Sequence, residues 1–516
     1  EIRNCDWSSD VCSSDLDELE RLRRAAGAAS GTPGGWLQVL GHAHLDLAWL
    51  WPVANTWRAA ERTFRSALSL MERHPQLHFG HSTPALYAWL EQQRPSLFGA
   101  IQAASAAGRW EPLNGPWVES DCVLLGTASL LRQFQEGQHY SQRAFPDWDH
   151  SVAWLPDSFG FSAGLPAVAA STGVRWFCTH KLAWNATNPF PHRLFRWRSR
   201  CGAELLALMT APIGTDGDPV AIETHRLAWQ AASGLEVALW LPGVGDHGGG
   251  PTAEMLEQLA LWQGQPNAVR QRHGSLRAFL AELEPLAGQL PVWRDELYLE
   301  LHRGCPTSRP DQKRHNRSLE RLLREAELAR ALLRPGVDPA VASAPDAASG
   351  ATLSPPAWPG EPASMAQAEP GATAKSAADA DAIDWRPLLF QQFHDILPGT
   401  SIPEVFEQAE PQWRAARRRA RRQRDQALAA VPAPAARQPR GEEAWRVAQL
   451  GPWPAEPRTL RLPAGQWWLR SREGERPLPG QAAPGGGQWL QLPGIAGCGV
   501  WSLCRRRDPA APSTPG

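Results

Sequence analysis

The sequence predicts an α/β fold with mostly parallel strands, and three observations support this. Short apolar segments of strand character alternate with helical segments through the first half of the chain. The segment 36–51 (WLQVLGHAHLDLAWLW) is an almost continuous apolar run, as expected of a strand that is buried on both faces. Acidic residues and histidines follow several of these strands, and active sites form at the carboxyl ends of parallel strands.

The composition excludes several classes of protein. The chain has 516 residues, with 52 Lys and Arg against 53 Asp and Glu, and a net charge of −1. This balance argues against nucleic acid or an anionic membrane as a partner, and no apolar run is long enough to span a bilayer. The 8 cysteines form no CxxC pair, which favours reduced thiols in a cytoplasmic protein. A homo-oligomer is compatible with this composition.

The first domain is expected at 17–265, as a catalytic α/β domain. The preceding residues 1–16 (EIRNCDWSSDVCSSDL) lack the periodicity of the rest and are interpreted as an artefactual leader. A short charged helix is expected at 17–29, and longer helices at about 57–74, 84–107 and 128–144. Besides 36–51, strands are expected within the segments LHFGHS, RWEPLNGPWVES, SVAWLPDS, VRWFCTHKL, AELLALMTA and LEVALWLPG.

The second half predicts a helical domain at 266–430 and an incomplete β domain at 431–516. Leucines and alanines recur at three- and four-residue spacing in RSLERLLREAELARALL, and residues 266–334 are expected to be largely helical. An Ala/Pro/Ser/Gly-rich stretch at 335–381 is interpreted as a disordered insertion. The basic run RAARRRARRQR lies on a helix expected from Pro403 to Ala430 and is interpreted as a solvated helix face.

The segment GHAHLD at 41–46 is the first candidate site. His42, His44 and Asp46 alternate along the chain and would share one face of a strand. Two imidazoles and a carboxylate at the end of a buried strand suit a borderline metal such as zinc. A polar strand end that only makes hydrogen bonds is the alternative.

Two further segments place a carboxylate after an apolar strand. In WLPDSFGFS, Asp157 is either a functional carboxylate or part of an Asx turn. The segment GVGDHGGGPT at 243–252 formally contains GxGxxG, but it comes late in the chain, and Asp246 would bring a negative charge near the phosphates. We therefore reject dinucleotide binding and prefer a glycine-rich loop through which a bulky ligand approaches Asp246.

Three polar segments complete the set. THKLAWN at 179–185 and ELYLELHRG at 296–304 supply amide, cationic and carboxyl groups that can bind hydroxyls. In FHDILPGT at 393–400, His394 and Asp395 are, taken alone, typical of a helix end with a capping aspartate.

Taken in chain order, these segments resemble glycoside hydrolase family 38, the α-mannosidases, in its bacterial and cytosolic branch. The shared motifs are HxHxDxxWxW, WxxDSFGxS, TxKLxWN, GDxGGGPT, ELYxExHRG and HDxLPGTS, which cover about residues 36–430. The resemblance implies a seven-stranded α/β barrel, then a three-helix bundle, then β-sandwich domains. Members of the family run further, so we expect this chain to be a C-terminally truncated fragment.

The resemblance also implies roles for individual residues. One divalent metal, Zn²⁺ or else Co²⁺, would be held by His44, Asp46, Asp157 and His394, while His42 would orient the site without binding the metal. Asp157 would also be the nucleophile and Asp246 the acid/base, with Glu296 and Glu300 as backup carboxylates. Relatives usually carry glycine where this chain has His247. The residues expected to bind substrate are Trp49, Lys181, Asn185, Glu300, His302, Arg303 and Asp395.

These roles predict a metal-dependent retaining α-mannosidase that releases terminal α-mannosyl residues from oligosaccharides or glycans through a covalent mannosyl-aspartate intermediate. A metal-dependent polysaccharide deacetylase or amidohydrolase is one alternative, since it also places His and Asp at strand ends. A non-catalytic carbohydrate-binding remnant is the other.

Overall fold

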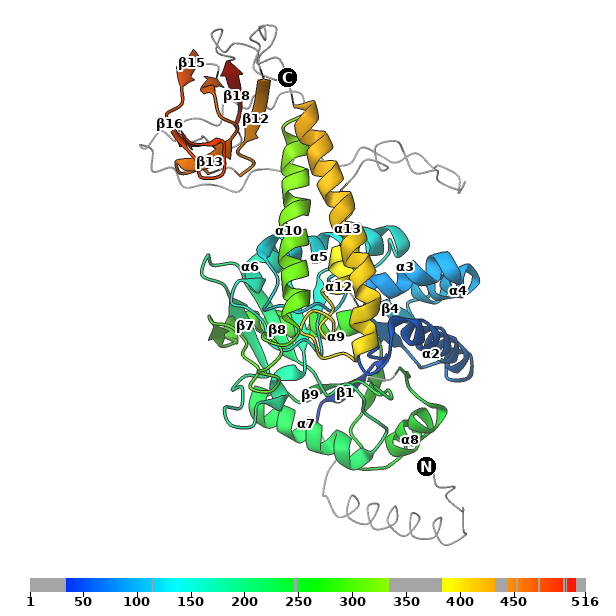
Figure 1. Ribbon diagram of the computed structural model, residues 1–516. Helices are drawn as coiled ribbons and strands as arrows, with labels where there is room; N and C mark the ends of the chain where they lie inside the picture. Colours follow the sequence, from blue (N-terminus) through cyan, green and yellow to red (C-terminus); the bar gives the residue numbers. More distant parts are fainter. Residues whose placement is uncertain are drawn as a thin grey trace, which may run out of the picture. The chain divides into compact units, whose positions relative to one another are not determined.

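A computed structural model of the chain describes residues 34–113, 115–245, 248–333, 383–431, 443–451, 453–471, 474–494, 497 and 499–506 (Figure 1). These residues form two compact units. The first contains the described chain up to Glu320 together with Trp385–Trp413, and the second contains Arg321–Asp384 and the chain from Arg414 onward. The predicted leader at 1–16, the helix at 17–29 and the insertion at 335–381 lie outside the described residues.

The first unit contains three sheets whose strands are parallel, apart from one neighbouring pair. β1 pairs with both β9 and β10, β2 continues the chain of β1 and leads to β3 and β4, and the third sheet has the order β11-β7-β8-β6-β5. Only the β7–β8 pair in this unit is antiparallel among the described residues. The strands are β1 (Trp36–Val39), β2 (Gly41–His42), β3 (Phe79–His81), β4 (Trp110–Pro112), β5 (Val152–Trp154), β6 (Trp176–Thr179), β7 (Leu194–Arg198), β8 (Glu204–Met209), β9 (Val237–Trp240), β10 (Gln271–His273) and β11 (Val292–Trp293).

The predicted α/β class with mostly parallel strands is confirmed. The described pairings do not close the three sheets into one ring, so the seven-stranded barrel stays a prediction. β10 and β11 lie beyond residue 265 and yet pair with β1 and β7, so residues 266–334 are less uniformly helical than expected.

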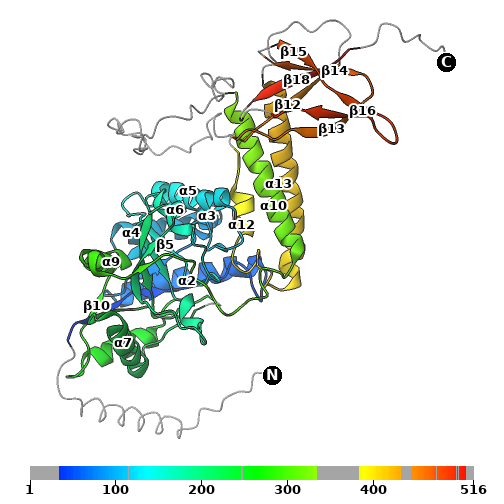
Figure 2. The same ribbon diagram turned by 90° about the vertical axis from the view of Figure 1, so that its left-hand side faces the viewer.

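The central strands are buried on both faces, as the apolar runs predict. On β5 and β6, Trp154 and Trp176 belong to one apolar cluster, whereas Ala153 and Phe177 belong to another. Because successive side chains of a strand point to opposite faces, the sheet separates two cores. Helices lie outside the strands in both views (Figures 1 and 2).

The helices of this unit follow the expected segments, with one interruption. The helix expected at 84–107 is divided at Arg94, because the proline at position 95 disfavours helical geometry in the residue before it. α2 buries Ala60, Phe64, Ala67 and Met71 at helical spacing. The helices are α2 (Val53–Arg73), α3 (Pro84–Gln93), α4 (Pro95–Ala106), α5 (Thr127–Ala144), α6 (Leu165–Ala170), α7 (Pro219–Ser233), α8 (Ala253–Gln263), α9 (Leu276–Leu283) and α12 (Arg386–Gln391), with 3-10 turns η1 (Lys181–Trp184) and η2 (Glu284–Gln289).

Two long helices begin in the first unit and continue into the second. They are α10 (Pro310–Ala331) and α13 (Pro403–Ala430), and α13 has the predicted bounds. They lie side by side in both views (Figures 1 and 2). Trp413 Nε1 of α13 donates to Gln312 Oε1 of α10 at 2.8 Å, and Arg424 pairs with Glu325 at 2.8 Å.

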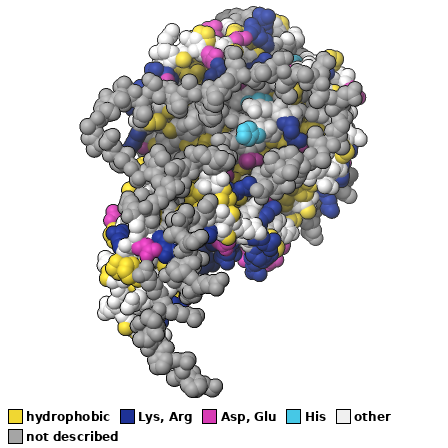
Figure 3. Space-filling model, turned by 90° about the horizontal axis from the view of Figure 1, so that it is seen from above, with side chains coloured by type: hydrophobic (Ala, Val, Ile, Leu, Met, Phe, Trp, Pro, Cys, Tyr) yellow, Lys and Arg dark blue, Asp and Glu magenta, His cyan; other side chains and the backbone are white. Residues whose placement is uncertain are grey.

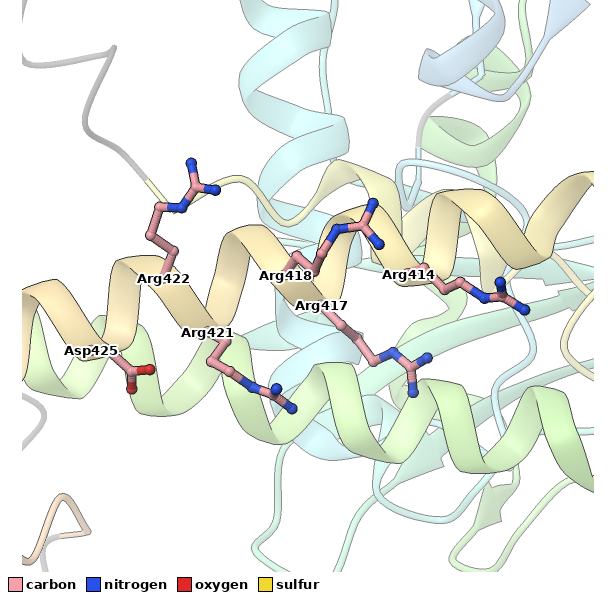
Figure 4. A pocket seen from close by; sticks show the side chains of 6 residues that line it. All are labelled: Arg414, Arg417, Arg418, Arg421, Arg422 and Asp425. Carbon is pink, nitrogen blue, oxygen red and sulfur yellow. The ribbon is translucent and has the colours of Figure 1, made fainter.

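The basic run of α13 forms two rows at four-residue spacing. Figure 4 shows Arg414, Arg418 and Arg422 in one row and Arg417, Arg421 and Asp425 in the other, along a shallow groove. All are exposed except Arg417, which is half-buried. The arginine side chains do not converge on one point (Figure 4), as expected of a solvated helix face.

The second unit also contains two antiparallel sheets, where the sequence predicts β structure. Their orders are β12-β18-β14-β15 and β13-β17-β16. Trp467, Leu469, Leu490 and Leu503 form the shared core. The strands are β12 (Glu443–Ala448), β13 (Arg458–Leu462), β14 (Gln466–Ser471), β15 (Gly474–Pro477), β16 (Gly480–Ala482), β17 (Gln488–Leu492) and β18 (Val500–Arg506).

The described surface agrees with the balanced composition. Figure 3 shows one face, on which basic and acidic side chains are interspersed. Among the described helices, none combines the length and the apolar composition that crossing a bilayer requires.

Candidate metal centre

Four residues from three separate segments meet in the first unit. His44 and Asp46 follow β2, Asp157 follows β5, and His394 follows α12. Each offers one ligand atom, and these atoms all lie within 4.8 Å of one another. These are the four residues for which the sequence predicts metal binding.

The two histidines are fully enclosed, and Asp157 lies at the more open side. His44, Asp46 and His394 are at most 3% exposed, and the Asp157 side chain is 13% exposed. β2 ends at His42, so His44 and Asp46 lie in irregular chain beyond the strand. The predicted alternation of all three side chains on one strand face is therefore wrong.

His394 has the tautomer and the environment of a metal ligand. Its Nδ1 lies 2.9 Å from the Glu119 carbonyl oxygen, which only accepts, so Nδ1 carries the proton. Its Nε2 then faces Asp46 Oδ1 at 3.2 Å and Asp157 Oδ2 at 3.3 Å, without a well-formed hydrogen bond to either. A lone pair opposite two carboxylate oxygens requires a proton or a cation between them.

His44 lies between two carboxylates. Nε2 contacts Asp46 Oδ1 at 3.0 Å, and Nδ1 lies 3.3 Å from Glu119 Oε2. Burial alone would lower the pKa of His44, but Glu119 and Asp46 outweigh burial and raise the pKa well above its ordinary value. A cation bound at Nε2 would displace a proton there.

Asp157 is held ionised by its surroundings. Burial raises the pKa of Asp157, but the neighbouring imidazoles of His180 and His394 outweigh burial and hold the pKa well below its ordinary value. Lys181 Nζ donates to Asp157 Oδ1 at 2.5 Å. The low pKa keeps the Asp157 carboxylate ionised at neutral pH.

His42 and Asp395 lie beside the cluster. His42 Nδ1 bonds to the Gly80 carbonyl at 2.9 Å, so this hydrogen bond does not go to a member of the cluster. Burial lowers the pKa of His42 to about 4, which keeps its imidazole neutral. Asp395 Oδ2 lies 3.7 Å from His394 Nε2, and burial raises the pKa of Asp395 to about 7.

Aromatic side chains lie around Lys181, the lysine that contacts Asp157. Lys181 Nζ lies 3.6 Å from the ring centroid of Trp184, and the Phe159 ring is tilted against the exposed His302, with their centroids 4.6 Å apart. His302 has a left-handed backbone with φ of 60°, an uncommon conformation for a non-glycine residue. Trp49, for which the sequence predicts substrate binding, is half-buried, and its ring centroid lies 5.9 Å from that of Trp51.

Asn185 and Glu300 connect two loops, although the sequence predicts that they bind substrate. The Asn185 amide donates to the Tyr298 carbonyl and accepts from the Glu300 N–H. The Glu300 carboxylate accepts from the Thr187 and Asn188 N–H groups at 2.9 and 2.8 Å. Arg303 donates to the Glu300 carbonyl, and Glu296 is exposed. A substrate-binding role for Asn185, Glu300 and Arg303 stays a prediction, as does the backup acid/base role of Glu296.

The loop that carries Asp246 runs beside the cluster, although Asp246 and His247 themselves lie outside the described residues. It follows β9 and leads into α8, as predicted. Gly248 has a φ of +81°, and a Cβ there would lie 2.7 Å from Leu45 Cδ2. The left-handed backbone of Gly248 therefore favours glycine where this loop packs against Leu45, between His44 and Asp46.

Sequence reasoning missed Glu119 and Ser82. Glu119 contacts both histidines of the cluster, and Ser82 Oγ donates to Glu119 Oε1. Neither residue stands in a recognisable motif. The available signal was an acidic residue directly after the apolar residues Pro116, Trp117 and Val118.

Two family models match the chain. Residues 36–296 match the glycosyl hydrolases family 38 N-terminal domain, and residues 300–431 match the alpha mannosidase middle domain.

Similar proteins extend well beyond this chain. Alpha-mannosidase 2C1 of Homo sapiens is 32% identical over 388 residues, which are 75% of this chain and 34% of that protein. Alpha-mannosidase G of Dictyostelium discoideum is 30% identical, over 71% of this chain and 31% of its own length. The chain thus spans about a third of the length of these relatives. An alpha-mannosidase of Enterococcus faecalis V583 has a similar fold, with a TM-score of 0.68 and 14% identity over 92% of this chain and 56% of that one.

Proposed function

Since this chain belongs to glycosyl hydrolase family 38, we propose that it is the catalytic part of a metal-dependent retaining α-mannosidase. The observation that carries the proposal is the buried His44–Asp46–Asp157–His394 cluster. Two imidazoles and two carboxylates form a donor set that suits Zn²⁺, with Co²⁺ as a substitute. When bound, the metal would supply positive charge for the nucleophile and for substrate hydroxyls. The substrate we propose is a terminal α-mannosyl residue of an oligosaccharide or glycan.

We propose Asp157 as the nucleophile because it is the most open member of the cluster. Its oxygen would attack the anomeric carbon as the bond to the leaving oxygen breaks, giving a covalent mannosyl-aspartate. The low pKa of Asp157 supports this role, since an ionised carboxylate is needed at neutral pH. Lys181 would orient that carboxylate through its contact with Oδ1.

The second carboxyl group would donate a proton to the leaving oxygen and later take one from water. We propose Asp246 for this role, because its loop packs against the segment of His44 and Asp46. Phe159, Trp184 and His302 supply aromatic surfaces of the kind that pack against a sugar ring.

We also propose a cytoplasmic location. All five cysteines among the described residues are thiols, and Cys122 and Cys178 lie in the core. This is the expected state in a reducing compartment.

The proposal predicts chelator-sensitive hydrolysis of an aryl α-mannoside. We expect the purified chain to release the aryl group, to lose activity with chelator, and to regain it with Zn²⁺ or Co²⁺. Asp157→Asn should lower kcat at least about a thousandfold, because the nucleophile is gone. Asp149→Asn, which changes an aspartate that pairs with Arg175 outside the cluster, is the control. Hydrolysis that persists in Asp157→Asn would refute the nucleophile. Bound metal without any hydrolysis would favour a carbohydrate-binding remnant.

A further inference from the structure

Glu119 contacts both histidines of the cluster, through two different parts of the residue. Its carboxylate Oε2 lies 3.3 Å from His44 Nδ1, and its main-chain carbonyl lies 2.9 Å from His394 Nδ1. In each histidine the opposite nitrogen, Nε2, faces the cluster. Glu119 itself offers no atom to the group of four candidate ligands.

The position of Glu119 is fixed from several sides. Ser82 Oγ donates to Oε1, which leaves Oε2 directed at His44. The neighbouring Ser120 forms an antiparallel bridge with Phe393, and the His394 N–H donates to the Glu119 carbonyl at 3.2 Å. The Glu119 residue is 3% exposed.

The contact between the Glu119 carboxylate and His44 gives each group a polar partner that it otherwise lacks among the described residues. His44 Nδ1 and Glu119 Oε2 are both buried, and neither makes a hydrogen bond with any other described residue. A metal at His44 Nε2 would leave the proton on Nδ1, which is the donor that Oε2 needs. Carboxylates that accept from the distal nitrogen of a ligating histidine fix its tautomer and ring orientation.

We infer that Glu119 is the positioning residue of the metal centre, with its side chain orienting His44 and its main chain orienting His394. This inference rests on the proposed function, in that it presupposes a metal at the cluster. It assigns Glu119 no contact with the metal or the substrate.

Metal titration of the metal-free chain tests the inference without an activity assay. We expect Glu119→Gln to weaken Co²⁺ binding, measured by calorimetry, about 10–100-fold and to change the visible spectrum of bound Co²⁺. Glu111→Gln is the matched control, because Glu111 is also a buried glutamate but accepts from Leu276 and Arg277 at a helix end. It should leave Co²⁺ affinity within about threefold of the parent value, as for sites that share no partner.

A double-mutant cycle separates positioning from a general structural role. If Glu119 acts through His44, Glu119→Gln should cost little further affinity once His44→Ala is present. Ser82→Ala, which frees Oε1 without removing the carboxylate, should weaken binding to a smaller extent and serves if Glu119→Gln does not fold. The inference alone would be overturned, with the proposed metal centre intact, if Glu119→Gln or Ser82→Ala bound Co²⁺ with the affinity of the parent chain. The same holds if Glu119→Gln weakened Co²⁺ binding as much in the His44→Ala background as in the parent chain. A parent chain that binds no metal would overturn the proposed centre as well.

Discussion

At the residue scale, Lys181 places a buried positive charge beside Asp157. It is 2% exposed, pairs with Asp157 Oδ1 at 2.5 Å and lies over the ring of Trp184. A buried carboxylate that loses its partner is destabilising. In this site, however, a bound metal would also compensate the charge of Asp157.

Lys181→Met should therefore destabilise the metal-free chain more than the metal-loaded chain. We expect the free energy of unfolding to fall by about 3 kcal/mol in chelator and by clearly less in excess Zn²⁺, as measured by urea unfolding. Lys313→Met is the control, because Lys313 donates to the Ser308 and Pro398 carbonyls and, among the residues that the structure describes, to no carboxylate. Its cost should be the same in both conditions. An equal loss of stability for Lys181→Met in both conditions would contradict the argument that Lys181 and the metal both compensate the charge of Asp157.

The sequence predicted the four clustered residues but not their supporting contacts. His44, Asp46, Asp157 and His394 stand in motifs whose order along the chain is specific. Glu119 is different, because its role depends on a bridge between Ser120 and Phe393. Such long-range pairing has no local periodicity that a single sequence could reveal. The same holds for Asn185 and Glu300, whose polar groups bind backbone of neighbouring loops.

At the scale of elements, Glu111 connects β4 with α9. Its carboxylate accepts from the Leu276 and Arg277 N–H groups, at the positive end of the helix. Burial raises the pKa of Glu111 from 4.5 to about 7, although these two hydrogen bonds oppose the rise. The folded state therefore binds this proton more tightly than the unfolded state does.

Glu111 should make the chain less stable as the pH rises. Because its folded pKa is raised, its contribution is complete below pH 4.5 and is lost as the pH rises through about 7. The difference amounts to about 3 kcal/mol. Glu111→Gln should remove this part of the pH dependence in urea unfolding between pH 5 and 8, whereas Glu72→Gln, at an exposed glutamate, should not. Parallel pH profiles for the parent and Glu111→Gln would show that the carboxyl group is not perturbed.

Element prediction succeeded where periodicity is long and failed where it is short. α13 has the bounds that the sequence predicts for it. The division between α3 and α4 was missed, although Pro95 supplies its physical cause. β10 and β11 have only three and two residues, too few for a period of two to be recognised.

At the scale of the whole molecule, all four candidate ligands belong to the first unit. This includes His394, although the residues Arg321–Asp384 that come before it in the chain belong to the second unit. A ligand that binds only folded protein stabilises the unit that carries its site. Calorimetry should therefore resolve a transition that Zn²⁺ moves to higher temperature, at a gain of about 2.7 kcal/mol when zinc is 100-fold above its Kd. The transition of the β-sheet unit should not move. A common shift of all transitions would indicate that the units unfold together.

The α/β class and the mostly parallel strands were predictable because alternating apolar runs directly reflect burial on both faces of a sheet. The division of the chain into two units was harder to predict from the sequence. The boundary of the first unit crosses α10 and α13 in mid-helix, whereas domain boundaries usually fall in exposed linkers.

The convergence of distant segments at the metal centre also sets an order of events during synthesis. His44, Asp46 and Asp157 leave the ribosome early, whereas His394 is translated more than 200 residues after Asp157. At about 5–20 residues per second, this delay lasts about 10–50 s. During that time the nascent chain carries an open set of three ligands, and Glu119 has not yet met the residue that its carbonyl will hold. Metal retention by the growing chain should therefore begin only when the segment after α12 has emerged.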